Sequence, residues 1–217
     1  MQKILSGDQV RELDSQHLKF SGQTNHELME VASNAFVNWF LDRHIPKDLP
    51  VFIAVGAGNN GGDGLAIARL LSGHSYSVSV LKCFGSNARL SADALLNLQD
   101  LPDSVRVVDF DEWVFPQSGF LIDAFLGVGL KGELRSDAGK HIQRINEFKG
   151  TVISVDLPSG LPSDSLGTND VVKADFTVSF AFPKLSLILP EHAEFVGELV
   201  VLKIALKEEA YKDLSTS

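Results

Sequence analysis

The sequence predicts an α/β protein whose mostly parallel sheet is covered by helices on both faces. Short apolar runs, rich in β-branched residues, recur along the chain and are continuous instead of alternating, as in strands buried on both faces. Segments with helical periodicity lie between the early runs, an alternation typical of doubly wound folds. These observations predict a three-layer α/β/α, Rossmann-like sandwich, and the length suits one domain spanning residues 1–217.

An N-terminal helix pair precedes the first strand. Ser6 is a candidate N-cap, and apolar residues follow it at helical spacing as far as Phe20. After the breaker Ser21-Gly22, a second helix is expected over about 26–41. The simplest interpretation of the pair is a cover for the sheet or an oligomer surface.

The strands are expected at 51–55, 78–83, 120–124, 151–155, 176–182 and 199–204, with a weaker candidate at 105–110. Helical patterns occupy about 65–71, 91–98 and 138–148. Only residues 183–198 separate the last two strands, without a full helix, so we expect a mixed edge to the sheet. Beyond Ile204 the sequence turns polar, and residues 207–217 are expected to fray or to form a linker.

Composition limits the classes of function. A net charge of -9, without a basic run, argues against binding to nucleic acid or to an anionic membrane. The single cysteine, Cys83, excludes a disulfide framework and a thiolate metal cluster. No apolar stretch reaches the ~18 residues of a membrane span, and the first residues do not resemble a signal peptide. We therefore expect a cytoplasmic protein. Cys83 is interpreted as a small strand hydrophobe, and His17 and His192 as surface or satisfied core residues.

A glycine-rich loop follows the first strand. Five glycines lie among residues 56–64, and a helix comes directly after them. Such a loop can bring backbone N–H groups against a ligand at a helix N-terminus, which suits a phosphate. The loop matches G-x-G-x-x-G, but the next strand ends in Lys82-Cys83-Phe84, without the acid that binds ribose in ordinary dinucleotide sites. A Walker loop is excluded because no Gly-Lys-Ser/Thr follows.

Two further loops leave the same expected edge of the sheet. Asp123 ends one strand and precedes a second glycine-rich loop, whereas Asp156 ends the next strand and precedes a rigid turn. With Asp63, three carboxylates should converge, and they need a cation, a shared proton or hydrogen-bond donors among them. A hard monovalent or divalent ion with oxygen ligands fits better than zinc, because the six histidines are scattered.

Together the loops resemble the NAD(P)H-hydrate epimerases, the YjeF N-terminal domain family. The resemblance rests on Gly58-Asn59-Asn60-Gly61-Gly62-Asp63-Gly64, on Asp123 with the loop at 127–133, and on Val155-Asp156-Leu157-Pro158-Ser159-Gly160. It extends to Glu27-Leu28-Met29-Glu30, Lys173-Ala174-Asp175, Phe182-Pro183-Lys184 and Gly197-Glu198-Leu199. It covers nearly the whole chain. It implies interconversion of the R and S forms of the 6-hydroxy adduct of NADH and NADPH, so that a dehydratase can use the S form.

The resemblance also implies roles for individual residues. Asn60, Asp123 and Ser159 would hold a potassium ion through oxygen atoms. The hydrated NADH or NADPH would be held by Asn59, Asn60, Gly61, Gly62, Asp63, Gly127, Val128, Gly129, Leu130, Lys131, Gly132, Glu133 and Asp156.

The chemistry at the altered carbon indicates which groups should be catalytic. That carbon bears a hydroxyl beside a ring nitrogen, so loss of the hydroxyl gives a cation that water can re-enter from either face. A general acid must protonate the leaving hydroxyl, and a base must accept a proton from the water. We assign this role to Asp156, with Lys131 steadying charge or phosphate. A ring-opening route would use the same residues.

Two other functions remain open from the sequence. A non-catalytic nucleotide-binding or protein-interaction scaffold could share this fold. Loss of the acids would favour that function, and their presence in this sequence argues against it. An ordinary nicotinamide oxidoreductase would need a ribose-binding acid and a hydride-transfer set, and neither is visible.

A homodimer is expected as well. The N-terminal helices carry Leu28, Trp39 and Phe40, which looks like more apolar surface than a cover helix needs. The chain could also work with, or be fused to, an NAD(P)HX dehydratase.

Overall fold

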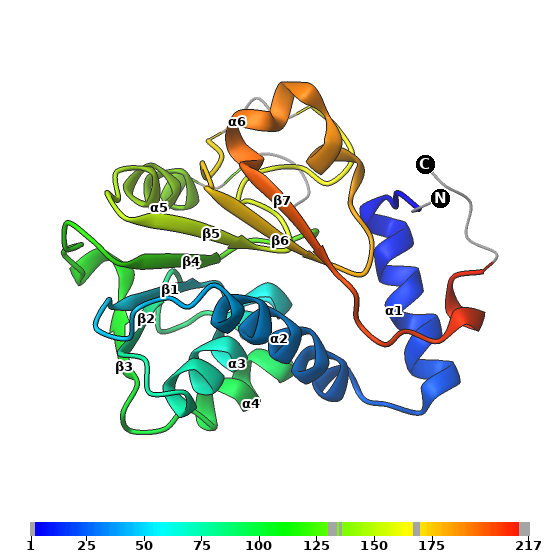
Figure 1. The fold of residues 1–217 in the computed structure, drawn as a ribbon, viewed down its shortest axis with the longest axis horizontal. Coiled ribbons are helices and arrows are strands. Elements are labelled where there is room, and N and C mark those ends of the chain that lie inside the picture. Colours follow the sequence, from blue (N-terminus) through cyan, green and yellow to red (C-terminus); the bar gives the residue numbers. More distant parts are fainter. Residues whose placement is uncertain (1–2, 130–133, 135, 167–169, 213–217) are drawn as a thin grey trace.

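The computed structural model describes residues 3–129, 134, 136–166 and 170–212. The predicted strands form one sheet in the order β3-β2-β1-β4-β5-β6-β7, and each neighbouring pair is parallel (Figure 1). The strands are β1 (Val51–Val55), β2 (Val78–Lys82), β3 (Arg106–Asp109), β4 (Phe120–Ala124), β5 (Thr151–Val155), β6 (Phe176–Phe180) and β7 (Glu198–Leu202).

The expected mixed edge is wrong, because β7 runs parallel to β6. No long helix is needed for the crossover between them. The chain returns to the edge of the sheet at which the strands begin through short 3-10 turns and a single-turn helix. The turns are Leu185–Ile188 and Pro190–His192, and the helix is α6 (Ala193–Val196).

Helices cover both faces of the sheet, as the sequence predicts (Figure 1). Phe36 and Phe40, from α2, pack with Leu65 and Ile67, from α3, on one face. Ile142, from α5, lies in a separate cluster on the opposite face. The helices are α1 (Gly7–Ser21), α2 (Asn25–Asp42), α3 (Asn59–Gly73), α4 (Ala92–Gln99) and α5 (Ser136–Asn146).

Capping explains where the N-terminal helices begin. The Ser6 hydroxyl accepts from the Gln9 N–H while the Gln9 side chain accepts from the Ser6 N–H, and Thr24 and Glu27 form the same capping box for α2. Gly22 ends α1 in the left-handed conformation, with φ of 75°.

The two helices have different places in the fold. Helix α2 joins the layer formed with α3, whereas α1 stands across the end of the sheet, beside the C-terminal segment (Figure 1). Leu28 and Phe40 are buried within the chain, so the premise that they form a surplus apolar face is wrong. Trp39 is half-buried against Phe36 and Phe176.

The C-terminal segment packs as far as Lys212 instead of fraying after Ile204. A 3-10 turn, η4 (Glu208–Ala210), lies against α1, and Ala210 joins a cluster with Leu5 and Leu13. Residues 213–217 of the predicted tail lie outside the described residues.

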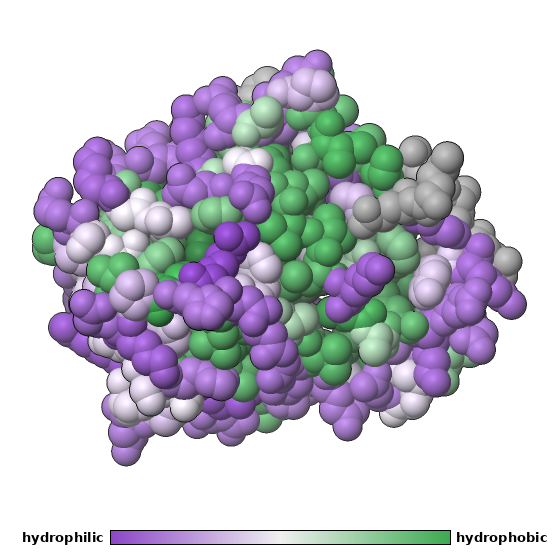
Figure 2. Space-filling view, in the orientation of Figure 1, coloured by the Kyte–Doolittle hydropathy of each residue, from purple (hydrophilic) through white to green (hydrophobic). Residues whose placement is uncertain are grey.

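The face shown in Figure 2 has a band of apolar residues over β7 and α2, with hydrophilic residues at both ends. Among the described helices, none is both long enough and apolar enough to cross a bilayer.

Candidate active site

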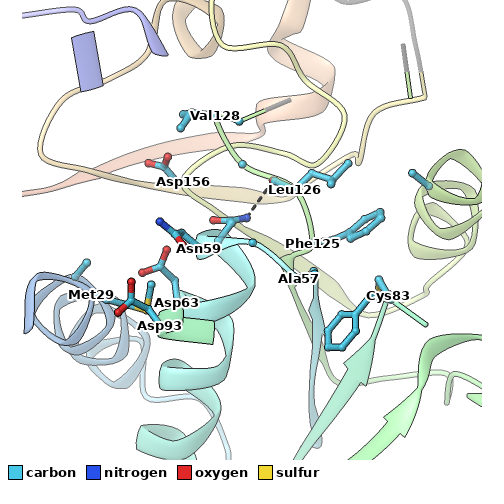
Figure 3. Close-up of a pocket in the computed structure, with 18 of the residues that line it drawn as sticks. Met29, Ala57, Asn59, Asp63, Cys83, Asp93, Phe125, Leu126, Val128 and Asp156 are labelled. Carbon is cyan, nitrogen blue, oxygen red and sulfur yellow. Dashed lines mark hydrogen bonds between the residues drawn. The ribbon is translucent and has the colours of Figure 1, made fainter. Parts of the chain in front are cut away.

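A cavity of about 1350 Å³ lies at the carboxyl ends of the strands, where an open α/β sheet binds its ligands. Strand ends and loops form its inner wall and α1 its outer wall. Its inner lining includes Asn59, Asp63, Leu126 and Asp156, and α1 contributes Asp14. Figure 3 shows Asn59 and Asp63 on the side of the cavity where Asp156 lies.

The first glycine-rich loop is shorter than predicted, because α3 begins at Asn59 and not near Leu65. Gly58 is the N-cap, so the predicted contact residues from Asn59 to Asp63 occupy the first turns of the helix. Backbone N–H groups at this end have no partners within the helix, and the helix dipole favours an anion there.

Two glycines allow this loop to pack tightly. A Cβ at Gly61 would lie 1.9 Å from the Gly56 carbonyl oxygen, and one at Gly56 would lie 1.9 Å from the Phe125 carbonyl oxygen. The start of α3, the first loop and the end of β4 are therefore in backbone contact. Gly62 approaches the Met29 side chain and is buried.

The second loop lies against the first. The Asn60 amide donates to the Leu126 carbonyl oxygen at 3.0 Å, the contact dashed in Figure 3. A Cβ at Gly127 would lie 3.0 Å from the Asn60 Cβ. Val128 lines the cavity and is half-buried, whereas Gly129 is exposed at its rim. The predicted residues Leu130, Lys131, Gly132 and Glu133 lie outside the described residues.

Asp123 ends β4 as a fully buried carboxylate that is surrounded by donors. The Ser159 hydroxyl donates to Oδ1 at 2.5 Å, and the Ser159 N–H and the Ser154 hydroxyl each donate to Oδ2 at 2.8 Å. The Phe125 N–H donates to Oδ1 at 3.3 Å. Burial raises the pKa of Asp123, and these four hydrogen bonds oppose the rise.

Ser159 extends this contact to the second loop, because its hydroxyl also accepts from the Leu126 N–H at 2.8 Å. Three residues predicted together, Asn60, Asp123 and Ser159, are thus joined through one hydrogen-bonded loop segment.

Asp156 ends β5 in a different environment. It has a φ of 67°, a conformation that costs a non-glycine residue roughly 1–2 kcal/mol and is concentrated at functional sites. Its side chain is 14% exposed and forms a salt bridge with Lys184, whose side chain is 1% exposed. The Ser179 hydroxyl donates to the same carboxylate at 3.2 Å, and Lys184 donates to Ser179 at 3.1 Å.

The carboxyl of Asp63 avoids charge repulsion from the other acids in a third way, by holding a proton. Burial raises the pKa of Asp63 well above its ordinary value, and the carboxylates of Asp156 and Asp14 raise it further, against the effect of Lys184. The protonated form of Asp63 is therefore favoured. Each of the three predicted strand-end or loop acids is accommodated by a different device: donors, an ammonium group, or a bound proton.

The sequence analysis missed two residues of this site, Lys184 and Asp14. Lys184 is part of the Phe182-Pro183-Lys184 motif of the family resemblance, but the sequence alone assigned it no role. Its position directly after Pro183, at the end of a buried strand, could have indicated a site residue. Asp14 lies on the polar side of a helix expected to face solvent, and nothing local in the sequence places it opposite Asp156.

His17 and His192, for which the sequence left surface and core positions open, are buried, and so is Cys83, a predicted strand hydrophobe that also lines the cavity. His17 contacts the Gln23 side chain through Nε2 at 2.8 Å and accepts from the Lys207 N–H at 3.0 Å. His192 is buried against the Ser186 carbonyl. Cys83 is buried just past β2, and burial raises the pKa of its thiol well above the ordinary value.

Comparison with known proteins agrees with this geometry. The chain is 31% identical to an NAD(P)H-hydrate epimerase of Lentilactobacillus buchneri, over 95% of this chain and 96% of that protein. It is 32% identical to a bifunctional NAD(P)H-hydrate repair enzyme Nnr of Coxiella burnetii, where it spans 44% of the longer protein. The crystal structure of yeast YNL200c superposes with a TM-score of 0.73 at 26% identity, covering 84% of this chain and 82% of that one.

A family model also matches most of the fold. Residues 25–186, which run from the start of α2 to just beyond Lys184, match the model described as YjeF-related protein N-terminus. The chain therefore belongs to the family of YjeF-related protein N-termini.

Proposed function

We propose that this protein is an NAD(P)H-hydrate epimerase, an isomerase that interconverts the R and S hydrates of NADH and NADPH. The observation that carries the proposal is the Asp156 carboxylate, which has a left-handed backbone conformation and a salt bridge with a buried lysine, at the edge of a dinucleotide-sized cavity. Relatives that match nearly end to end are NAD(P)H-hydrate epimerases.

The cavity suits the size and charge of the substrate. Ligand sites for drug-sized molecules usually measure about 300–1,000 Å³, and this cavity, at about 1350 Å³, has room for a dinucleotide. We assign the diphosphate to the N-terminus of α3 and the facing second loop, where Asn59, Asn60 and Gly127 meet. Lys131 keeps its proposed role of steadying phosphate charge.

Asp156 is the proposed acid and base at the hydroxylated carbon. The salt bridge with Lys184 and the hydrogen bond from Ser179 fix the carboxylate in one orientation, and 14% of the side chain remains open. Fixed orientation is what lets a proton move to or from a reacting oxygen without reorganisation of the site.

A potassium ion is the proposed cofactor. Asn60 Oδ1, the Leu126 carbonyl oxygen, Asp123 and Ser159 Oγ form an all-oxygen set from adjoining segments, which fits a hard cation. The Asn60 amide directs its N–H to Leu126, which leaves Oδ1 available. Bound there, the ion would supply positive charge beside the buried Asp123. Anomalous scattering from a thallium-substituted crystal tests this: density beside these oxygens supports the ion, and a lysine ammonium in its place contradicts it.

The proposed dimer interface is the apolar band over β7 and α2. A parallel edge strand with partly exposed apolar residues, such as Val200, offers a self-complementary surface, so we propose a homodimer through this face (Figure 2). A dehydratase is the proposed functional partner, because relatives that repair the same hydrates include bifunctional proteins of about twice this length. Light scattering that shows a 23.6 kDa species at micromolar concentration would contradict the dimer.

The function is tested by chromatography of the separate R and S hydrates of NADH. The purified protein should bring either isomer to the same mixture far faster than buffer alone. Binding of the hydrates without interconversion would contradict the proposal and favour a nucleotide-binding scaffold.

A further inference from the structure

The outer wall of the cavity is formed by α1, all of which lies before the residues that match the family model. Val10, Arg11, Leu13 and Asp14 of this helix line the cavity. Val10 and Asp14 are four residues apart and so share one face of the helix. That face lines the same cavity as Asp156, which follows β5.

Three contacts fix α1 relative to the inner wall. Before the helix, the Leu5 N–H donates to the Pro183 carbonyl oxygen at 3.1 Å, and Leu5 forms a parallel bridge with Lys184. Within the helix, the Arg11 guanidinium donates to the Val128 carbonyl oxygen of the second loop at 3.1 Å. Behind it, His17 accepts from the Lys207 N–H. Asp14 is therefore held at a defined position on the wall that α1 contributes to the cavity.

No contact among the described residues explains the place of Asp14. Within the part of the chain that the structure describes, its carboxyl forms no hydrogen bond and no salt bridge, although it is half-buried. The charged groups that act on it are Asp156 after β5, Lys184 after β6 and Asp63 on α3. Burial, and then Asp156, raise the pKa of Asp14 to about 6, with Lys184 opposing the rise. A carboxyl of this kind is a proton donor near neutral pH.

Epimerisation through a planar ring cation needs proton transfer on both faces of the ring. If the hydroxyl leaves from one face and solvent water enters from the other, the first oxygen must gain a proton and the second must lose one. A carboxyl on one wall of the cavity reaches only one face of a planar ring. Asp156 alone would return water to the face it left, with no inversion.

We propose that Asp14 is the second catalytic residue, acting on the ring face opposite to Asp156; this rests on the epimerase function proposed above. In one direction the C6–O bond breaks as Asp14 gives its proton to the departing hydroxyl, which leaves as water, and the ring nitrogen lone pair forms a C=N bond. Water then bonds to C6 on the other face, gives a proton to Asp156, and the nitrogen recovers its lone pair. The reverse direction exchanges the two roles.

The test compares Asp14→Asn with Glu12→Gln, which removes an exposed carboxylate from the same helix. Asp14→Asn should lower kcat at least ~100-fold, the usual contribution of a general acid or base, with KM changed less than about threefold. Glu12→Gln should leave both parameters unchanged. In the wild type kcat/KM should fall as the pH rises through about 6, and Asp14→Asn should lack this fall.

Other results would overturn the assignment. A raised KM with unchanged kcat would make Asp14 a binding residue, and a loss of kcat in Asp63→Asn but not in Asp14→Asn would move the role to Asp63. In water labelled with ¹⁸O each inversion should incorporate one solvent oxygen, and inversion without incorporation contradicts the route. A wild-type protein with no epimerase activity would refute the function itself, a result distinct from all of these.

Discussion

The ends of β4 and β5 hold an aspartate each, on neighbouring strands, yet the two carboxylates differ in every respect that matters for chemistry. Asp123 is fully buried and accepts four hydrogen bonds from Ser154, Phe125 and Ser159. Asp156 forms a salt bridge with Lys184, and part of its side chain stays open to the cavity. A carboxylate that accepts hydrogen bonds on both oxygens joins loops together, whereas one held through a single oxygen can exchange protons with a ligand.

The largest expected effect is on catalysis by Asp156→Asn, which should lower kcat ~10²–10⁴-fold because an amide cannot donate and recover a proton. The same change leaves the buried Lys184 ammonium without its counterion, which for a buried pair costs roughly 3–5 kcal/mol of stability. The double variant Asp156→Asn, Lys184→Met should recover the stability but not the activity. Denaturant unfolding and the chromatographic assay separate the two effects, and recovery of activity in the double variant would remove Asp156 from the mechanism.

Lys184→Met alone should reduce kcat by roughly 10–100-fold, because a catalytic group displaced by about 1 Å can lose 10² in rate. The unfolding free energy should fall as well, because the Asp156 carboxylate, only 14% exposed, loses its ammonium partner. Lys173→Met is the matched control, because Lys173 pairs with Glu194 on the exposed surface. Equal activity in the two variants would show that Lys184 does not position Asp156.

Asp123→Asn should act mainly on stability. It replaces an acceptor of four hydrogen bonds with a group that presents its own donor, at a cost of about 2–4 kcal/mol. At about 2–4 °C per kcal/mol for a chain of this size, the melting temperature should fall by roughly 10 °C. Ser154→Ala, which removes one donor, should cost only about 1 kcal/mol. Equal losses in calorimetry for both variants would contradict the shared network.

The smallest effect concerns pH and Asp14. Its carboxyl has a pKa of 3.8 when unfolded and about 6 when folded, so between these values the folded state binds more protons. The free energy of unfolding therefore falls as the pH rises from about 4 to 6, and the full loss is reached above pH 6. Asp14→Asn should raise the melting temperature slightly at pH 8 and not at pH 4. A melting temperature raised equally at both values would show that ionisation of Asp14 is not the cause.

The architecture was predictable because its signals are local. Continuous apolar runs identify strands buried on both faces, and caps such as Ser6 and Thr24 mark the helix starts. The direction of β7 was not predictable, because a parallel return normally takes a full helix, and here 3-10 turns and the short α6 suffice.

The active site also combines features that were predictable from the sequence with features that were not. Strand-end position alone places Asp123 and Asp156 on one edge, so their proximity followed from the parallel sheet. What distinguishes them depends on partners distant along the chain: Ser159 lies 36 residues from Asp123, and Lys184 lies 28 residues from Asp156. Asp14 is farther still from the strand ends in sequence, and only the packing of α1 brings it to the cavity.

The most direct test of the difference between the two strand ends is the kcat for hydrated NADH in Asp156→Asn and Asp123→Asn, measured at a temperature where both are folded and with potassium in excess. We expect Asp156→Asn to convert R to S no more than ~1% as fast as the wild type, while Asp123→Asn keeps at least about a tenth of the rate. Equal loss in the two folded variants, or near-normal conversion by Asp156→Asn, would contradict it.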